Sequence, residues 1–251
     1  MRRKRRGEEV KVEGEFVRVA DACLHVLREG RGAPLALLPG GFGCEDYLRD
    51  VSDLLSDTFE VLRIEPRGCG RSSETLPYDV ASNVRDLDGI RAALGFDTWI
   101  VGGHSAGADL ALAYAVHFAK RTRALLHMAG TGVHNDRDWS AAYHAGKDAG
   151  LDPLPDPPPA WNPEVHAAMT SSWRQWIKRP ELLGELARLD VPTLFLHGEQ
   201  DVRPSWPVRQ LAHLLPQARY EDVAGARHWL WLDHADEVRT RLRRFLGALP
   251  T

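Results

Sequence analysis

Short apolar segments alternate with helix-like segments along the first half of the chain. Two β-rich segments at 16–19 and 24–27 predict an antiparallel pair at the edge of a sheet. Continuous apolar runs, typical of buried parallel strands, follow at 35–38, 61–64, 99–101, 125–129 and 193–197. Between the earlier runs, the apolar spacing of helices occurs at 48–55, 84–94 and 108–118. The pattern predicts an α/β fold with a mostly parallel central sheet of about eight strands flanked by helices.

The alternation stops between residues 133 and 189. The proline-rich segment 151–159 can form neither a helix nor a central strand. Aromatic residues surround it: Trp139, Tyr143, Trp161, Trp173 and Trp176. They would either pack a helical excursion onto the body of the protein or line a pocket under a cap, and one segment can do both.

The strand pattern resumes at Val191, so the irregular segment is an insertion within the sheet sequence. We therefore expect a core of residues 14–132 and 190–251 and a helical cap insertion of residues 133–189. Residues 1–13 are expected to be a disordered or extended leader. The basic run 2–6 in this leader could bind an acidic surface, although a leader with no role is the simpler interpretation.

Composition narrows the class of partner. The chain has 251 residues, which suits one fairly large domain, and a net charge of −3 argues against nucleic acid as a main partner. We find neither the roughly 18 uninterrupted apolar residues of a membrane helix nor the apolar core of a secretory signal. The three cysteines lack metal-site spacing. We expect a cytoplasmic monomer or homodimer that acts on a small molecule and needs no metal or cofactor.

One motif carries the candidate chemistry. Ser105 is the centre of Gly103-His104-Ser105-Ala106-Gly107, which follows an apolar strand and precedes a helical segment. In this setting the serine lies on a sharp strand-to-helix turn, and the two glycines allow strand and helix to approach closely. A serine hydroxyl is a weak nucleophile and needs a positioned base. Ser105 is therefore the candidate catalytic nucleophile.

The base and its acid partner are expected in loops that follow later strands. His228 lies between the last short apolar segment and the final amphipathic segment 235–246, whereas His234 lies at or inside that helix. Asp201 follows the apolar run 193–197, with Glu199 on the same loop as its main rival and Asp136 as a weaker one. We predict His228 as the base and Asp201 as the carboxylate that orients it.

An acyl-transfer site also needs donors for a developing oxyanion. The N–H of Ala106, directly after the serine, would supply one. Gly41, in the glycine-rich loop after the run 35–38, is the predicted second donor and Phe42 is the alternative. The predicted substrate pocket consists of Phe42, Trp139, Trp173 and Trp229.

Together these motifs resemble the α/β-hydrolase superfamily, in the branch of small esterases and proline-iminopeptidase-like capped hydrolases. The resemblance runs from about residue 16 to 246 outside the insertion. It rests on the oxyanion loop 38–43, the loop 65–72, the nucleophile elbow 103–107, and the acid and base loops 198–201 and 225–228. It implies the α/β-hydrolase fold and a Ser-His-Asp triad.

The sequence departs from the family pattern in three places. Pro39 stands where the family usually has His before Gly, so the hydrogen bonds that order this loop must come from elsewhere. Glu65 replaces the usual Asp, and Ala106 replaces the Trp typical of proline iminopeptidases, which weakens that assignment. Arg67 is expected to fix its own loop rather than to bind a carboxylate substrate. Asp109 is expected to be a carboxylate favoured by a helix N-terminus rather than one that tunes the site electrostatically.

Three functions fit this pattern. The first is a serine hydrolase that cleaves a carboxylic ester or related acyl compound with an apolar or aromatic group, through an acyl-enzyme. The second is an aminopeptidase or amidase in which a cap carboxylate such as Glu164 holds the substrate's amino group. The third is a binding or biosynthetic protein built on the same scaffold.

Overall fold

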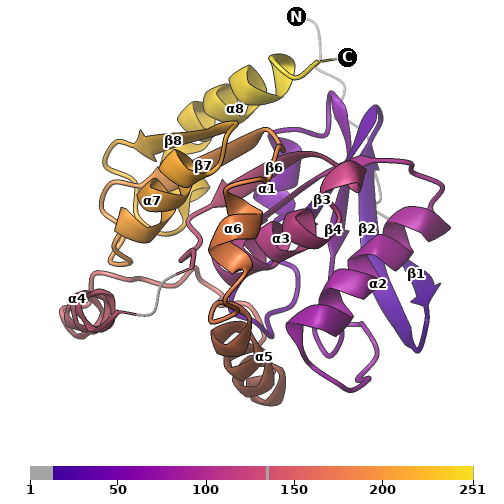
Figure 1. The fold of residues 1–251 in the computed structure, drawn as a ribbon, viewed down its shortest axis with the longest axis horizontal. Coiled ribbons are helices and arrows are strands. Elements are labelled where there is room, and N and C mark those ends of the chain that lie inside the picture. The colour runs from indigo at the N-terminus through magenta and orange to yellow at the C-terminus, as the bar shows by residue number, and fades with distance from the viewer. Residues whose placement is uncertain (1–13, 134–135, 251) are drawn as a thin grey trace, which may run out of the picture.

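The computed structural model describes residues 14–133 and 136–250, and the predicted leader 1–13 lies outside the described residues. One eight-stranded sheet runs through the molecule (Figure 1). Its strands are β1 (Gly14–Val19), β2 (Ala22–Gly30), β3 (Ala33–Leu38), β4 (Phe59–Ile64), β5 (Trp99–His104), β6 (Thr122–Met128), β7 (Thr193–Gly198) and β8 (Ala218–Val223). The order across the sheet is β1-β2-β4-β3-β5-β6-β7-β8.

The strand directions agree with the sequence pattern. β1 pairs antiparallel with β2 at the sheet edge, and β2 pairs antiparallel with β4. All the remaining neighbours pair in parallel. The predicted α/β fold with a mostly parallel sheet flanked by helices is therefore confirmed.

Helices cover both faces of the sheet. They are α1 (Arg49–Asp53), α2 (Val80–Ala93), α3 (Ala106–His117), α4 (Arg137–Asp148), α5 (Pro163–Trp176), α6 (Leu182–Leu186), α7 (Trp206–Leu214) and α8 (Leu230–Gly247), with a short 3-10 turn at Ala119–Arg121. Residues of α1 and α8 pack with one face of β3, β6 and β7 into one buried cluster, and residues of α2, α3 and α7 pack on the other face. Burial of these two apolar faces is the main stabilising contribution to the fold.

The chain changes direction across the sheet between β3 and β5. From β3 it passes to β4 on one side, and from there it returns through α2 to β5 on the other side of β3. In open α/β sheets this switch point separates the loops at the carboxyl ends of the two strands and creates a crevice for ligands. The glycine-rich loop after β3 and Ser105 after β5 lie at this point.

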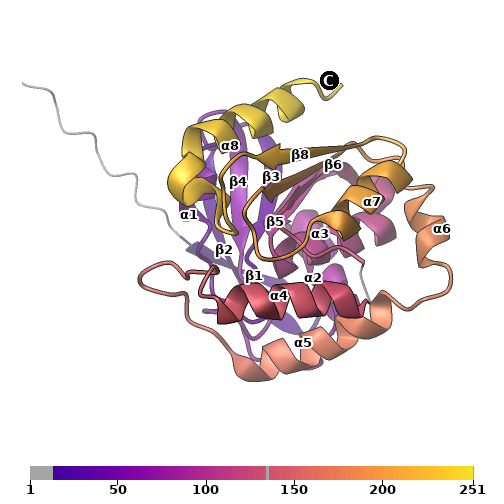
Figure 2. The same cartoon turned by 90° about the vertical axis from the view of Figure 1, so that its left-hand side faces the viewer.

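The insertion contributes α4, α5 and α6 between β6 and β7. Figure 2 shows α4 and α5 below the sheet, at one end of the molecule. The proline-rich segment 151–159 contains neither helix nor strand. α5 begins sharply because the Asn162 side chain accepts hydrogen bonds from the N–H groups of Glu164 and Val165, with Pro163 in the first turn.

Some helix boundaries differ from the sequence pattern. The segment 48–55 forms only the short α1. The predicted final helix from 235 is the second part of α8, which already begins at Leu230. His234 lies inside α8 at a kink, with non-helical φ and ψ of −130° and 33°. Helix α7 was not predicted from the sequence, because with nine residues it repeats the apolar spacing of a helix only briefly.

The helices were also compared with membrane-spanning helices, over the described part of the chain. None of its helices has both the length and the apolar character needed to cross a membrane.

The three cysteines are free, and burial raises the pKa of Cys44 to about 11 and that of Cys69 to about 12. Both thiols are therefore protonated at neutral pH, which makes them poor nucleophiles.

Candidate active site

The turn between β5 and α3 holds Ser105 in a strained backbone conformation. Its φ of 55° and ψ of −129° are rarely adopted by a residue with a side chain. The turn is also tightly packed, since a Cβ on Gly103 would lie 2.4 Å from the Gly107 carbonyl carbon, and one on Gly107 would lie 2.3 Å from the Leu38 carbonyl oxygen. Only glycine fits at these two positions, so the sequence fixes the turn that presents the serine.

His228 and Asp201 meet in the loops that follow β8 and β7. The His228 Nδ1 lies 2.7 Å from the Asp201 Oδ2, a hydrogen-bond distance between an imidazole and a carboxylate. Glu199 instead accepts a hydrogen bond from the N–H of Gly225, and Asp136 caps the N-terminus of α4. The structure thus brings the predicted base together with Asp201 and with neither rival.

The histidine pair His104 and His228 connects this acid–base couple to the nucleophile turn. Their ring centroids lie 4.5 Å apart, and the Nε2 of His104 lies 3.0 Å from the carbonyl oxygen of His228. Because His104 directly precedes Ser105, the base loop lies against the nucleophile turn. The Ser105 hydroxyl makes no hydrogen bond to another described residue. The structure thus packs the base loop against the turn but leaves the serine hydroxyl free.

The loop after β3 lies beside the serine. A Cβ on Gly40 would be only 2.7 Å from the Cβ of Ser105, so the absence of a side chain permits this approach. Within the part of the chain that the structure describes, the N–H groups of Gly41, Phe42 and Ala106 donate no hydrogen bond. These three amides, two of them predicted donors and one the alternative, are available to an incoming oxygen atom.

Tyr47 and His104 supply the hydrogen bonds that order this loop in place of the usual histidine. The Gly40 N–H donates to the Tyr47 hydroxyl oxygen at 2.6 Å, and that hydroxyl lies 2.8 Å from the Nδ1 of His104. Burial raises the pKa of Tyr47 and holds the pKa of His104 well below its usual value of 6.5, so both groups are neutral at neutral pH. A neutral hydrogen-bonded chain therefore links the base loop to the loop after β3.

Asp201 is a buried carboxylate with cationic partners. Burial favours its protonated form, but the interaction and hydrogen bond with His228, together with the Arg203 guanidinium, outweigh burial and lower the pKa of Asp201. Its other oxygen, Oδ1, accepts hydrogen bonds from the N–H of Arg203 at 2.9 Å and from the Arg203 Nη1 at 3.2 Å. Asp201 is thus ionised and fully hydrogen-bonded, as a carboxylate that orients an imidazole must be.

Comparisons with known proteins agree with this architecture. A family model described as the alpha/beta hydrolase fold matches residues 33–149, which include the loop after β3 and the nucleophile turn. The chain has the α/β-hydrolase fold.

Relatives and solved structures resemble the chain to different extents. A proline iminopeptidase of Xylella fastidiosa is 36% identical over 120 residues, which are 45% of this chain and 36% of that enzyme. The matched segment thus spans about a third of the length of such relatives. The structure of E-2-(acetamidomethylene)succinate hydrolase superposes with a TM-score of 0.78 at 17% identity, covering 94% of this chain and all of that one. An enol-lactonase from Burkholderia xenovorans has a TM-score of 0.75 at 22% identity, and the match covers 93% of this chain and 100% of that one.

The aromatic residues predicted to line a substrate pocket have different contact partners. Phe42 faces Trp173 of α5 with ring centroids 6.2 Å apart. Trp139 stacks on Tyr143 and donates from its Nε1 to the carbonyl oxygen of Pro204. Trp229 packs against Tyr47, 4.8 Å between ring centroids, and borders a cavity of about 220 Å³ that is lined by several prolines of the insertion.

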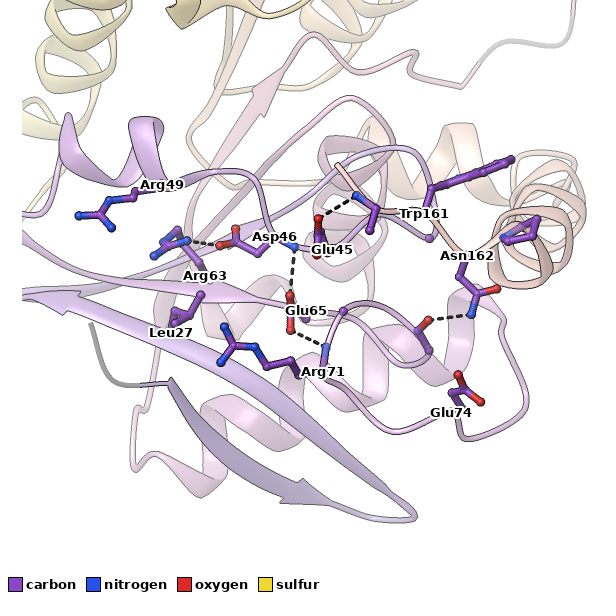
Figure 3. Close-up of a pocket in the computed structure, with 15 residues that line it drawn as sticks. Leu27, Glu45, Asp46, Arg49, Arg63, Glu65, Arg71, Glu74, Trp161 and Asn162 are labelled. Atoms are coloured by element: carbon purple, nitrogen blue, oxygen red, sulfur yellow. Dashed lines mark hydrogen bonds and ion pairs between the residues drawn. The ribbon is translucent and has the colours of Figure 1, made fainter. Parts of the chain in front are cut away.

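A larger open groove of about 820 Å³ lies away from the serine (Figure 3). It runs between the loop after β3, the loop after β4 and the start of α5, and charged side chains dominate its lining. Glu65, at its centre, accepts hydrogen bonds from the N–H groups of Asp46 and Arg71. Neither Ser105 nor His228 lines this groove. Its charged walls suit an apolar acyl group poorly.

The insertion is fastened to the edge of the same groove. The Asn162 side chain donates to the carbonyl oxygen of Gly68 (Figure 3). The N–H of Asn162 donates to the carbonyl oxygen of Gly43. Close by, the His166 Nδ1 donates to the carbonyl oxygen of Gly41 at 2.6 Å. The start of α5 thus holds the loop that carries the free amides.

Two buried charged residues, Arg67 and Asp109, have structural roles. Arg67 is buried and makes a two-pronged ion pair with Asp86, at 2.7 and 2.8 Å, which fixes the loop after β4 as expected. Asp109 was expected to interact with a helix N-terminus, and it also forms hydrogen bonds to residues after β6. Its carboxylate accepts hydrogen bonds from His127, from the N–H and hydroxyl of Thr131, and from the N–H of Gly132. It therefore anchors the segment that leads into the insertion.

Sequence reasoning missed Tyr47, Arg203 and Asp152, and it treated His104 only as a variable position of the turn motif. The need for a substitute for the usual histidine was visible at Pro39. No local pattern indicated which residues provide it, since Tyr47 and His104 are 57 positions apart.

Proposed function

We propose that the protein is a serine hydrolase that cleaves a carboxylic ester or related acyl compound through an acyl-enzyme. The observation that carries this proposal is the 2.7 Å hydrogen bond between His228 and Asp201 in loops packed against the strained Ser105 turn. A free serine hydroxyl at such a turn, with an oriented imidazole on the neighbouring loop, is the arrangement that activates a serine for acyl transfer.

In the proposed reaction the Ser105 Oγ attacks the carbonyl carbon and the His228 Nε2 takes the hydroxyl proton. The free N–H groups of Ala106 and Gly41 would stabilise the oxyanion, with Phe42 as the alternative second donor. Collapse of the intermediate breaks the bond to the alcohol, which receives the proton from His228. A water molecule then attacks the acyl-enzyme by the same proton route and releases the acid.

The substrate is proposed to carry an apolar or aromatic group. Support comes from Phe42 and Trp173, which bring aromatic surface next to the loop with the free amides, and from the proline- and tryptophan-lined cavity beside Trp229. Concave apolar surface with a few directed polar groups is typical of sites for small molecules.

Turnover of p-nitrophenyl esters of increasing acyl length tests this function. We expect the wild type to cleave them and Ser105→Ala to lower kcat by about 10⁴-fold or more, because the nucleophile is lost while the fold is kept. Equal activity in both proteins would exclude covalent catalysis by Ser105 and favour a binding or biosynthetic role on this scaffold.

An aminopeptidase or amidase is the second candidate, and the 36% identity to proline iminopeptidases over 120 residues favours it. Glu164, considered for holding a substrate amino group, lies exposed at the first turn of α5. Parallel assays with amino-acid anilides separate the two candidates: ester cleavage with intact anilides supports the esterase, and efficient anilide cleavage supports the peptidase.

A further inference from the structure

A buried ion-pair network extends from Asp201 into the insertion. The Arg203 guanidinium pairs with the Asp201 Oδ1 at 3.2 Å on one side. On the other side it makes a two-pronged contact with Asp152, at 3.0 Å to Oδ1 and 3.1 Å to Oδ2. It also lies 5.1 Å from the ring centroid of Tyr143 in α4. Both partners of Arg203 beyond the acid loop therefore belong to the insertion.

The network is shielded from water. The side chains of Asp201, Asp152 and Arg203 are 0%, 6% and 13% exposed. In such surroundings charge interactions are screened far less than on a surface, so an unbalanced charge acts on its neighbours. Burial lowers the pKa of Arg203, but the two carboxylates outweigh burial and raise it, so the guanidinium stays charged. Asp152 thus balances a fixed positive charge next to the proposed triad.

We propose that Arg203 is a positioning residue that couples the triad to the insertion. Asp152 neutralises the Arg203 guanidinium and so sets the net charge beside Asp201 and His228. The inference rests on the proposed function. With Asp152 in place, Arg203 orients Asp201 without adding net charge beside His228. Without Asp152, the uncompensated guanidinium disfavours the imidazolium that His228 must form when it accepts the serine proton.

Other ionisable groups face His228 and must be considered. Those on the acid side are Asp201, Arg203 and, at the end of β7, His197, whose Nε2 lies 3.8 Å from the Asp201 Oδ2. On the side of β5, His104 is hydrogen-bonded to the carbonyl oxygen of His228 and to the hydroxyl of Tyr47. Burial lowers the pKa values of His104 and His197 and raises that of Tyr47, so these groups are neutral where the enzyme is expected to work. Titration of His104, His197 and Tyr47 therefore does not mask the effect of a change of charge at Arg203 or Asp152.

The proposal predicts opposite shifts for the two partners of one ion pair. Asp152→Asn leaves Arg203 unbalanced, so the acidic limb of the pH profile of kcat/KM moves to lower pH, by about 0.5 to 1 unit. Arg203→Gln removes the positive charge, so imidazolium forms more readily and the limb moves to higher pH by a similar amount. In the double variant the two charges are both absent, and the limb returns to within about 0.3 units of the wild type.

A matched control is available on the surface. Arg209 pairs with Asp222 and lies 4.5 Å from the ring centroid of Tyr220, the same arrangement of arginine, carboxylate and tyrosine away from the triad. Arg209→Gln is expected to leave the limb unchanged. If both Asp152→Asn and Arg203→Gln only lowered stability, or moved the limb in the same direction, the bridge would be structural and the proposal overturned.

Failure of the proposed function gives a different result. If the wild type cleaves no ester, the same variants can be followed by the NMR titration curve of the His228 ring protons, which needs no turnover. Opposite displacement of that curve in the two single variants supports the coupling even then. An unmoved curve in both contradicts it.

Discussion

At the scale of single residues, the protonation of His104 follows from its two hydrogen bonds. The carbonyl oxygen of His228 can only accept, so the Nε2 of His104 carries the proton and donates to it. The Nδ1 of the neutral ring must then accept from the Tyr47 hydroxyl, whose oxygen in turn accepts from the N–H of Gly40. One directed chain thus runs from the proposed base to the loop with the free amides.

Tyr47→Phe tests this chain. The change leaves the Gly40 N–H and the His104 Nδ1 without partners, so the loop after β3 loses its anchor beside Ser105. We expect kcat on an ester to fall by about 10- to 100-fold with little change in KM, since a misplaced oxyanion donor acts on the transition state. Tyr114→Phe is the control. Tyr114 is also buried and donates a hydrogen bond to Asp88, but it lies in the core. Equal losses in the two variants would contradict the role of Tyr47.

At the scale of elements, the sequence predicted strands better than helices. Buried strands such as β3 and β5 are short continuous apolar runs that end at glycines, a signal that tertiary structure does not alter. Helix α7 packs against β8 and β7, and no local pattern encodes these contacts. The link from α3 to the insertion is likewise tertiary, because Asp109 in α3 holds the segment after β6.

Asp109→Asn should weaken this link. An amide has one acceptor oxygen in place of two, and its NH₂ group would face the donors of Thr131 or Gly132. We expect a loss of about 2 to 3 kcal/mol in the free energy of unfolding, measured with urea. Asp79→Asn provides the comparison, since Asp79 caps α2 and asparagine caps equally well. A loss at Asp109 no larger than at Asp79 would show that the carboxylate is not an anchor.

At the scale of the whole molecule, the sequence predicted the fold class and the loops from which Ser105, Asp201 and His228 come. Strand order makes this possible, because the carboxyl ends of parallel strands meet at one edge of the sheet. The contacts of the insertion with these loops were not predictable. They join residues such as Arg203 and Asp152, 51 positions apart, through side-chain geometry alone.

Buried neutral histidines make the stability of the molecule depend on pH. The pKa values of His104 and His197 lie below 6.5 in the folded state, so below about pH 6.5 the unfolded chain binds protons that the folded chain does not. The free energy of unfolding should therefore fall as pH decreases, by up to about 1.4 kcal/mol per pH unit for each histidine. Urea unfolding at pH 7.5, 6.5 and 5.5 measures this, and a midpoint that rises toward pH 5.5 would contradict it.

Covalent trapping of the nucleophile tests the central claim most directly. The wild type is incubated with a fluorophosphonate, and its intact mass and peptide map are compared with those of Ser105→Ala and His228→Ala. We predict a single adduct on Ser105, none in Ser105→Ala, and labelling slowed by about 10³-fold or more in His228→Ala, because the base that activates the serine is missing. A wild type that stays unlabelled, or an adduct that persists in Ser105→Ala, would contradict the account.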